Sequence, residues 1–282
     1  MKAADLYSRL EEDFKLSECT DEWDIEDNGY ITRSFISRGM GLMTDSTDTV
    51  ERSYTAVFPS SAVINKILSY KAGSGLLFVH HPMDWDIKRP VPFGNIPQHL
   101  LKKLKDSKIS IYNLHTALDK NGEYSTTVNL ARALEIEAEE DFYEYSGGHV
   151  GVIGKTKCNS VRELKEKLEE VYGHNAVLYG YADEDIFQNR VALIAGGGNE
   201  EEVYAMLKSK GINAYVTGIT SARTGYEPLV RAHESARENK VSILGGTHYS
   251  TEKFACIKMT EYFERFGLPC KFIPELPCMQ DM

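Results

Sequence analysis

Histidine and carboxylate side chains follow three apolar runs of this 282-residue chain, and they are of the types that ligate divalent metal ions. The three runs are LLFV, ISIYNL and VSILGG. The six side chains that follow them are His80, His81, His115, Asp119, His248 and Glu252. Each carboxylate stands four residues after a histidine, a spacing that places two side chains on one face of a helix.

These residue types predict a metal site. Neutral imidazoles with carboxylates suit zinc, manganese, iron, cobalt or nickel, and the absence of cysteine ligands argues against a closed structural zinc site. Adjacent histidines on a regular strand point to opposite faces, but where the strand ends, as Pro82 indicates for His80 and His81, both rings can converge. A single histidine is more often a structural or surface residue. The coincidence of six residues of suitable type at three strand ends favours the metal site.

The elements that would position these residues alternate between strands and helices, which predicts an α/β fold with mostly parallel sheets. Ligands collect at the carboxyl ends of such strands. The predicted strands are 54–59, 76–80, 109–114, 190–195, 212–218 and 241–246. The predicted helices are 62–71, 96–107, 161–173, 201–210, 227–240 and 251–266.

The middle of the chain, about 130–189, is the least regular part and indicates two α/β lobes. We expect lobe A to comprise 1–128 with 240–282 and to carry the metal site, and lobe B to comprise 129–239. Residues 146–157 read as a loop, and the acidic run 135–144 as a solvated helix or loop face. The glycines 196–198 are expected to form a tight turn rather than a phosphate-binding loop, because the G-x-G-x-x-G and P-loop patterns are absent.

Composition limits the function classes. The net charge of −10 argues against direct nucleic-acid binding. No apolar stretch is long enough for a membrane helix, and the N-terminus lacks a secretory h-region, so a cytoplasmic location is expected. The five cysteines are scattered and form no C-x-x-C pair, which predicts free thiols. Of the remaining histidines, His99, His149, His174 and His233 are interpreted as surface or structural residues.

The motifs HHPMDWD (80–86), HTALDKNG (115–122) and GGTHYSTE (245–252) resemble those of the NGG-interacting-factor family, the Nif-three-like dinuclear metal-centre proteins. DEWDIEDNGY (21–30) is similar to the N-terminal segment of that family, and SGGHVGVIGK (146–155) to its G-R-x-G loop. The order and spacing of the motifs match over nearly the whole chain. Some members of this family are known as homologues of a type 2 GTP cyclohydrolase.

The resemblance implies a ligand set for two divalent ions. His81 and Asp119 would bind one ion, His80 and His248 the other, and Glu252 would bridge both. It places His115 either among the ligands or directly beside them. It also implies the Nif-three-like fold of two α/β lobes and assembly into hexameric rings.

A two-ion site predicts a metal-dependent hydrolase that acts on a nucleotide-like, phosphorylated or cyclic amide substrate. The nucleophile would be a metal-bound hydroxide, and His115 is the candidate for proton transfer. The alternative is a non-enzymatic metal-binding protein, either a metal chaperone or a regulatory partner. Two segments, 83–86 and 219–223, differ from the family pattern and leave substrate preference open; Arg223 in the second is either an anion contact or a surface residue.

Overall fold

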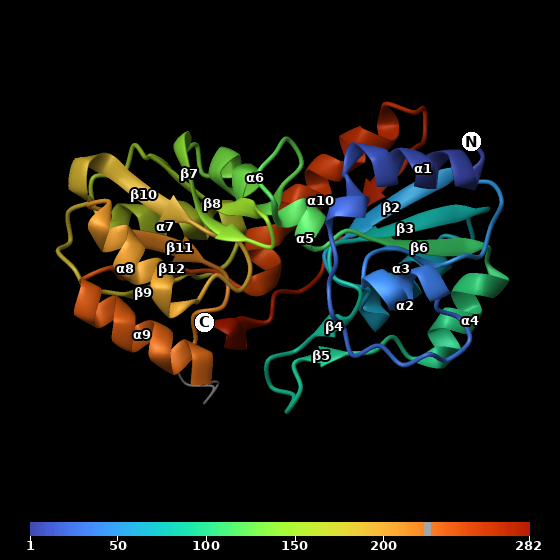
Figure 1. The fold of residues 1–282 in the computed structure, drawn as a ribbon, viewed down its shortest axis with the longest axis horizontal. Helices are drawn as coiled ribbons and strands as arrows, with labels where there is room; N and C mark the ends of the chain where they lie inside the picture. The colour runs from blue at the N-terminus through green and yellow to red at the C-terminus, as the bar shows by residue number, and fades with distance from the viewer. Residues whose placement is uncertain (223–226) are drawn as a thin grey trace. The chain divides into compact units, whose positions relative to one another are not determined.

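The computed structural model of the chain describes residues 1–222 and 227–282 (Figure 1). Two compact units divide the chain. Unit 1 comprises 1–119 and 256–276, and unit 2 comprises 120–255 and 277–282. One helix, α10 (His248–Glu264), belongs to unit 2 as far as Ala255 and to unit 1 from Cys256 onward.

Unit 1 contains a five-stranded sheet in the order β1-β6-β3-β2-β13. Its strands are β1 (Gly41–Thr44), β2 (Arg52–Ala56), β3 (Gly75–Val79), β6 (Ile109–Asn113) and β13 (Cys270–Phe272). All neighbours pair in parallel except β1 and β6. Val79 of β3 is level with Asn113 of β6, so these two strands end side by side. A short hairpin of β4 (Asp84–Trp85) and β5 (Phe93–Gly94) follows β3.

Helices cover both faces of the unit 1 sheet. One face carries α2 (Arg33–Arg38), α3 (Ser61–Ser69) and α4 (Gln98–Asp106), whose apolar residues share a core with Leu77, Val79 and Ile111. On the other face lies α1 (Ala3–Asp13), where Leu6 and Leu10 are fully buried, together with the C-terminal half of α10, where Phe263 contacts Phe78. The four-residue helix α5 (Thr116–Asp119) closes the N-terminal segment of the unit.

Unit 2 contains a six-stranded sheet in the order β7-β8-β10-β11-β12-β9. Its strands are β7 (Glu137–Tyr145), β8 (Gly148–Lys155), β9 (Val177–Tyr179), β10 (Arg190–Leu193), β11 (Ala214–Thr217) and β12 (Ser242–Gly245). The three central strands β10, β11 and β12 are parallel, and antiparallel strands flank them on both sides.

Adjacent residues of the central strands point to opposite faces, as strand geometry requires, and supply two cores. Val191 and Val216 pack with α6 (Thr126–Ala133) and α7 (Val161–Tyr172). Ala192 and Tyr215 pack with α8 (Glu201–Ser209) and α9 (Glu227–Asn239). Figure 1 shows these two helix pairs on the two sides of the unit 2 sheet.

The α/β class with mostly parallel sheets is confirmed, and two predictions in the middle of the chain are wrong. The acidic run predicted as a helix or loop face is strand β7, and the predicted loop 146–157 contains β8. Carboxylates of β7 pair with Lys155, Arg190 and Lys210, so an exposed edge strand carries the charge. The unit boundary falls at 119/120 rather than 128/129, and β12 belongs to unit 2 because it pairs with β11.

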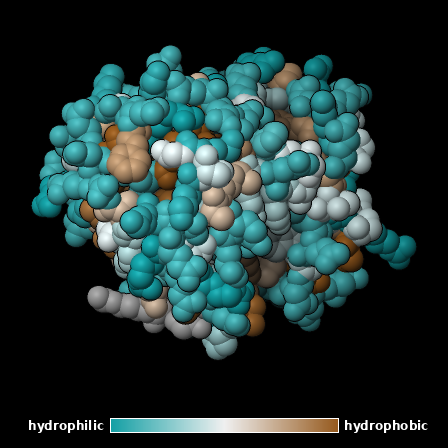
Figure 2. Space-filling view, turned by 60° about the vertical axis from the view of Figure 1, so that its left-hand side comes forward, coloured by the Kyte–Doolittle hydropathy of each residue, from teal (hydrophilic) through white to brown (hydrophobic). Residues whose placement is uncertain are grey.

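The face in Figure 2 is mainly hydrophilic, and its apolar residues lie in small separate patches. Large exposed apolar side chains are scattered through the described residues, among them Ile36, Val91, Phe187 and Leu276. No helix within 1–222 or 227–282 combines the length and apolarity needed to cross a bilayer.

Candidate metal centre

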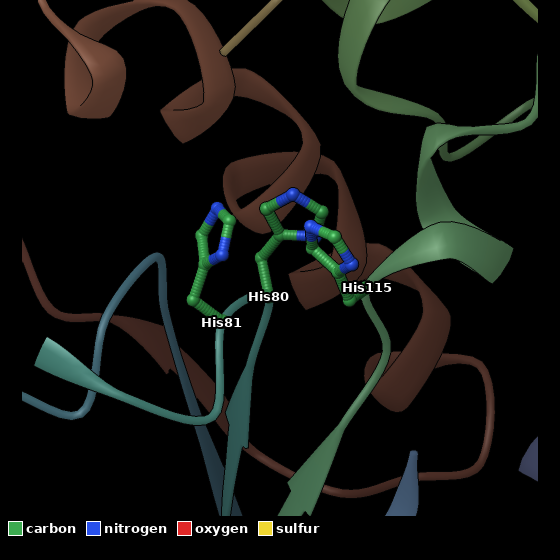
Figure 3. Close-up of side chains that lie close together, drawn as sticks. All are labelled: His80, His81 and His115. Carbon is green, nitrogen blue, oxygen red and sulfur yellow. The ribbon is translucent and has the colours of Figure 1, made fainter. Parts of the chain in front are cut away.

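In unit 1, the paired ends of β3 and β6 bring three imidazoles together. His80 and His81 follow β3 directly, and His115 follows β6 after one intervening residue. The backbone N–H groups of His80 and His81 donate to the carbonyls of Ala56 and Val57, at 3.3 and 2.9 Å, and so fix both residues to the end of β2. Figure 3 shows the three rings gathered at this edge of the sheet, and one nitrogen from each lies within 4.8 Å of the others.

The His80 ring is held in the orientation that a metal ligand needs. Its Nδ1 lies 2.9 Å from the carbonyl oxygen of Leu114, which fixes Nδ1 as the protonated nitrogen because a carbonyl can only accept. The lone pair is then on Nε2, which lies 3.4 Å from Oδ1 of Asp119. A histidine whose second nitrogen donates to a carbonyl is the usual arrangement at metal sites.

His115 is supported in the same manner by a carboxylate. Its Nδ1 lies 3.2 Å from Oδ2 of Asp21, and its Nε2 lies 3.8 Å from Oδ2 of Asp119. Thr116 also donates to Asp21, from its backbone N–H and from its hydroxyl. Burial acts to raise the pKa of Asp21, but the hydrogen bond and charge of His115 and the two bonds from Thr116 outweigh it and leave this pKa below its usual value. Nε2 of both His80 and His115 therefore faces Asp119.

Aromatic rings surround the imidazoles of unit 1. Phe58 stacks on His81 with ring centroids 4.9 Å apart, and Phe93 of the β4–β5 hairpin lies 5.4 Å from the same ring. Trp23 meets His115 edge-on at 4.8 Å. His80 and His81 are 0% and 2% exposed, whereas the side chains of His115 and Asp119 are 18% and 17% exposed. Solvent therefore reaches the cluster on the side of His115 and Asp119.

A cavity of about 320 Å³ lies next to two of the residues that contact His115. Asp21 and Trp23, which contact His115, also line the cavity, and Glu22 and Asp24 add two more carboxylates. The lining contains no lysine or arginine. A neutral or cationic group is therefore favoured there over a phosphate.

In unit 2, His248 and Glu252 form a pair in the first turn of α10. His248 Nε2 lies 3.1 Å from Oε1 of Glu252, and both side chains are buried. The predicted i, i+4 spacing thus places the two donors side by side. Gly196, at φ +73°, lies against the pair, because a Cβ at this position would overlap Oε1 of Glu252. The glycine turn after β10 makes room for the carboxylate instead of forming a phosphate loop.

Two devices cap the start of α10. Thr247 and Ser250 exchange hydrogen bonds between backbone N–H groups and side-chain hydroxyls, at 2.7 and 3.1 Å. The carboxylate of Asp281, which is fully buried, accepts the His248 N–H at 2.9 Å. The Asp281 carbonyl also accepts from the N–H groups of Thr220 and Ser221. The C-terminal segment therefore holds both the start of α10 and the segment after β11.

Of the predicted site residues, His80, His81, His115 and Asp119 belong to unit 1, and His248 and Glu252 belong to unit 2. The sequence did not identify Asp21, Phe58 and Phe93, because no spacing relates them to the histidines. The divergent segment 83–86 begins the β4–β5 hairpin. Residues 219–221 are buried, and Arg223 lies outside the described residues.

The remaining histidines differ among themselves. His99 and His149 are exposed and His174 is partly exposed. His233 is buried, and its Nε2 and Nδ1 lie 2.8 Å from the Thr220 carbonyl and the Tyr181 hydroxyl respectively. Burial lowers the pKa of His233, which favours the neutral ring in this structural role.

Imidazoles and a carboxylate grouped at the carboxyl edge of a parallel sheet define an α/β protein with a candidate metal centre. The chain belongs to the Duf34/NIF3 (NGG1p interacting factor 3) family, whose model matches residues 36–276. This confirms the resemblance drawn from the three motifs.

Relatives in sequence and solved structures of similar fold are known. Proteins named GTP cyclohydrolase 1 type 2 homolog are similar to the chain. The one from Pyrococcus abyssi is 29% identical and that from Pyrococcus horikoshii 28%, and each match covers 83% of this chain and 88% of the relative. The structure of protein ybgI, of unknown function, aligns with a TM-score of 0.75 at 23% identity over 98% of this chain and all of its own. Reduced HcgD from Methanocaldococcus jannaschii aligns with a TM-score of 0.67 at 21% identity over 98% of both chains.

Proposed function

We propose that the chain is a metal-dependent hydrolase with two divalent ions. The observation that supports this most strongly is the set of unit 1 donors: three imidazole nitrogens within 4.8 Å of one another, with Asp119 beside His80 and His115. The carbonyl partner on Nδ1 of His80 leaves its Nε2 lone pair for an ion, and the carboxylate partner on Nδ1 of His115 leaves Nε2 of that ring to accept a proton. The family resemblance adds His248 and Glu252 of unit 2 to the same centre.

When bound, a pair of divalent ions lowers the pKa of water and stabilises charge on the attacking and leaving atoms of a hydrolysis. His80 and His81 would serve only as ligands, because their rings are almost completely buried. His115 is the most exposed of the three rings, and we propose that it transfers the proton. Asp21 would fix its tautomer and orientation through the 3.2 Å contact with Nδ1.

The cavity beside His115 limits the substrate. Because Asp21, Glu22 and Asp24 line it, we propose that it accepts an uncharged or donor-rich part of the substrate, such as a nucleobase or a cyclic amide. Trp23 offers this part an aromatic wall. The names of the curated relatives are in keeping with a GTP cyclohydrolase-like ring opening, in which the base would be the reacting part.

The test begins with the metal content of purified protein, measured by inductively coupled plasma mass spectrometry. We expect about two ions per chain in the wild type and fewer in Glu252→Ala, with no change in His149→Ala, an exposed histidine outside the site. Equal metal in wild type and Glu252→Ala would remove Glu252 from the centre. A hydrolase screen with each metal restored, on nucleotides and cyclic amides, then tests the activity.

A metal chaperone or regulatory metal-binding protein is the second candidate, because the same imidazole and carboxylate donors would hold its ions. A chaperone would release its ions to an apo-acceptor and show no turnover with any restored metal. A hydrolase would retain its ions and lose turnover in His115→Ala while keeping most of its metal. The hexameric ring expected from the family resemblance also stays a proposal, which light scattering on the eluted protein tests.

A further inference from the structure

A second cavity, of about 290 Å³, lies in unit 1 at the opposite edge of the same sheet. Arg52 and Cys270, the first residues of the parallel strands β2 and β13, both line it. Arg52 is level with Gly75 at the start of β3, whereas His80 follows the end of that strand. Five residues of strand separate the two edges by about 13 Å along the chain, so a small molecule in this cavity does not reach the imidazoles.

The lining of this cavity includes two cations and two tyrosines, Arg52, Lys271, Tyr54 and Tyr70. Tyr54 and Tyr70 stack with centroids 5.9 Å apart and planes 16° from parallel. The Lys271 ammonium lies 4.6 Å from the centre of the Tyr70 ring, and Lys66 lies 5.7 Å from it. Contact with an aromatic face holds a lysine in position without neutralising its charge. The residues that line the cavity include no carboxylate.

Several lysines and arginines of the described residues are neutralised by a carboxylate partner. Arg38, Lys102 and Lys165 each pair with a carboxylate within 2.7 Å. Within the part of the chain that the structure describes, Arg52, Lys66 and Lys271 form no ion pair. In a chain of net charge −10 they concentrate uncompensated positive charge at one cavity.

The positive charge acts on the pKa of the Tyr54 phenol. Burial raises its pKa, while the charge and hydrogen bond of Arg52 and the charge of Lys271 act to lower it. Both cations therefore act on one buried hydroxyl at the same end of the cavity. An anion at this point meets a guanidinium fork, an ammonium group and a phenol hydroxyl.

We propose that this cavity binds the phosphoryl group of a small phosphorylated molecule, with Arg52 and Lys271 on its oxygens. Guanidinium groups match phosphate oxygens in a bidentate manner, and a lysine adds a point charge. The volume suits a ligand of mononucleotide size or less. Because the cavity is on the far edge of the sheet, this is a second site, and its existence does not depend on the proposed hydrolase activity.

Isothermal titration of chelator-treated full-length protein with inorganic phosphate, AMP and adenosine tests the proposal. Removal of metal excludes binding of phosphate at the metal centre. We expect AMP to bind with one site per chain, more tightly than phosphate, and adenosine not to bind. Lys271→Glu and Arg52→Gln should each weaken the affinity for AMP by at least about tenfold. Lys103→Glu, an exposed lysine on α4 with the same charge change, should alter the affinity less than about twofold.

Several results would overturn the proposal. One is the absence of saturable AMP binding after chelation, which would assign any phosphate binding to the metal centre. Another is equal binding of AMP and adenosine, since the phosphoryl group would then contribute nothing. Equal weakening by Lys271→Glu and Lys103→Glu would show a general charge effect in place of a site. Because Lys271 is exposed, its substitution is not expected to unfold the protein, and circular dichroism of both variants checks this.

Discussion

The two groups of candidate ligands are built in different ways. In unit 1 the donors follow two neighbouring strands, and tertiary contacts to the Leu114 carbonyl and to Asp21 set the orientation of two rings. In unit 2 both donors stand on one helical turn, and the i, i+4 spacing alone brings His248 to within 3.1 Å of Glu252. Strand ends thus need partners distant in sequence, whereas a helix supplies the geometry locally.

This difference affects how ready each group is for an ion. His80 carries its proton on Nδ1, so its Nε2 lone pair already points at Asp119. His248 uses Nε2 as the donor to Glu252, so an ion that takes either of these atoms must replace their hydrogen bond. Unit 1 is therefore the preorganised half of the proposed centre. We expect the loss of unit 1 ligands to have the larger effect on metal affinity.

The strongest test of this comparison removes both buried imidazoles of unit 1. His80→Ala/His81→Ala should weaken zinc affinity by more than about 100-fold, beyond the loss typical of residues that only support a ligand. Competition titration against a chromogenic chelator measures it. His99→Ala/His149→Ala, which removes two exposed rings, is the control. An affinity for zinc that is unchanged in the first double variant would exclude unit 1 as a metal site.

The second prediction concerns the cap on α10 in unit 2. Asp281→Ala removes a buried acceptor from the His248 N–H and should lower the free energy of unfolding by about 2 kcal/mol. Asp281→Asn keeps an oxygen acceptor, so its free energy of unfolding should fall by about half as much. Gln280→Ala, at an exposed neighbour, should have nearly the wild-type free energy of unfolding. Urea titration followed by circular dichroism measures all three. Equal stability of Asp281→Ala and Gln280→Ala would show that the cap does not stabilise α10.

The sequence predicted those parts of the fold in which local pattern and tertiary environment agree. Buried parallel strands such as β3 and β6 read as continuous apolar runs, and the bounds of α3, α7 and α8 were found to within two residues. Strand β7 was missed because its side chains alternate between acidic and apolar over only part of its length, and ion pairs with β8 and β10 neighbours stabilise it.

The ligands and their supports were predictable to different degrees. His115 with Asp119 and His248 with Glu252 are local in sequence, so spacing alone joined each pair. The contact of Asp21 with His115 links residues 94 apart, and only the folded chain reveals it. The same holds for the cavity at Arg52 and Lys271. These two cations belong to β2 and β13, which are far apart in sequence and pair in parallel.

Asp21→Asn tests whether the contact between Asp21 and His115 is important for the unit 1 part of the proposed metal centre. The amide keeps the shape but loses the negative charge that orients the ring, so we expect zinc affinity, and any hydrolysis found, to fall by about tenfold. Asp24→Asn changes charge equally in the same cavity without contact to His115, and it should leave both quantities near the wild-type values. If the two variants behave alike, the effect belongs to the cavity's charge and not to the His115 contact.

The smallest expected effect comes from Glu275, whose carboxylate accepts the Phe58 N–H at 3.1 Å behind the ring that stacks on His81. Burial raises the pKa of Glu275 to about 8, against the hydrogen bonds from Phe58 and Ser60, and the charge of Asp84 raises it further. Between about pH 4.5 and 8 the folded protein therefore holds a proton that the unfolded chain has lost, and the free energy of unfolding falls as pH rises through this window. Because the side chain is partly exposed, solvent screens the charge, and we expect a contribution of about 1 kcal/mol.

Urea titrations at pH 5 and pH 8.5 test this expectation. Between these two pH values the free energy of unfolding of Glu275→Gln should change by about 1 kcal/mol less than that of the wild type. Glu12→Gln, on the exposed side of α1, should follow the wild type. A pH dependence shared by all three proteins would show that Glu275 is ionised in the folded state near neutral pH, so that the packing behind His81 tolerates a charge.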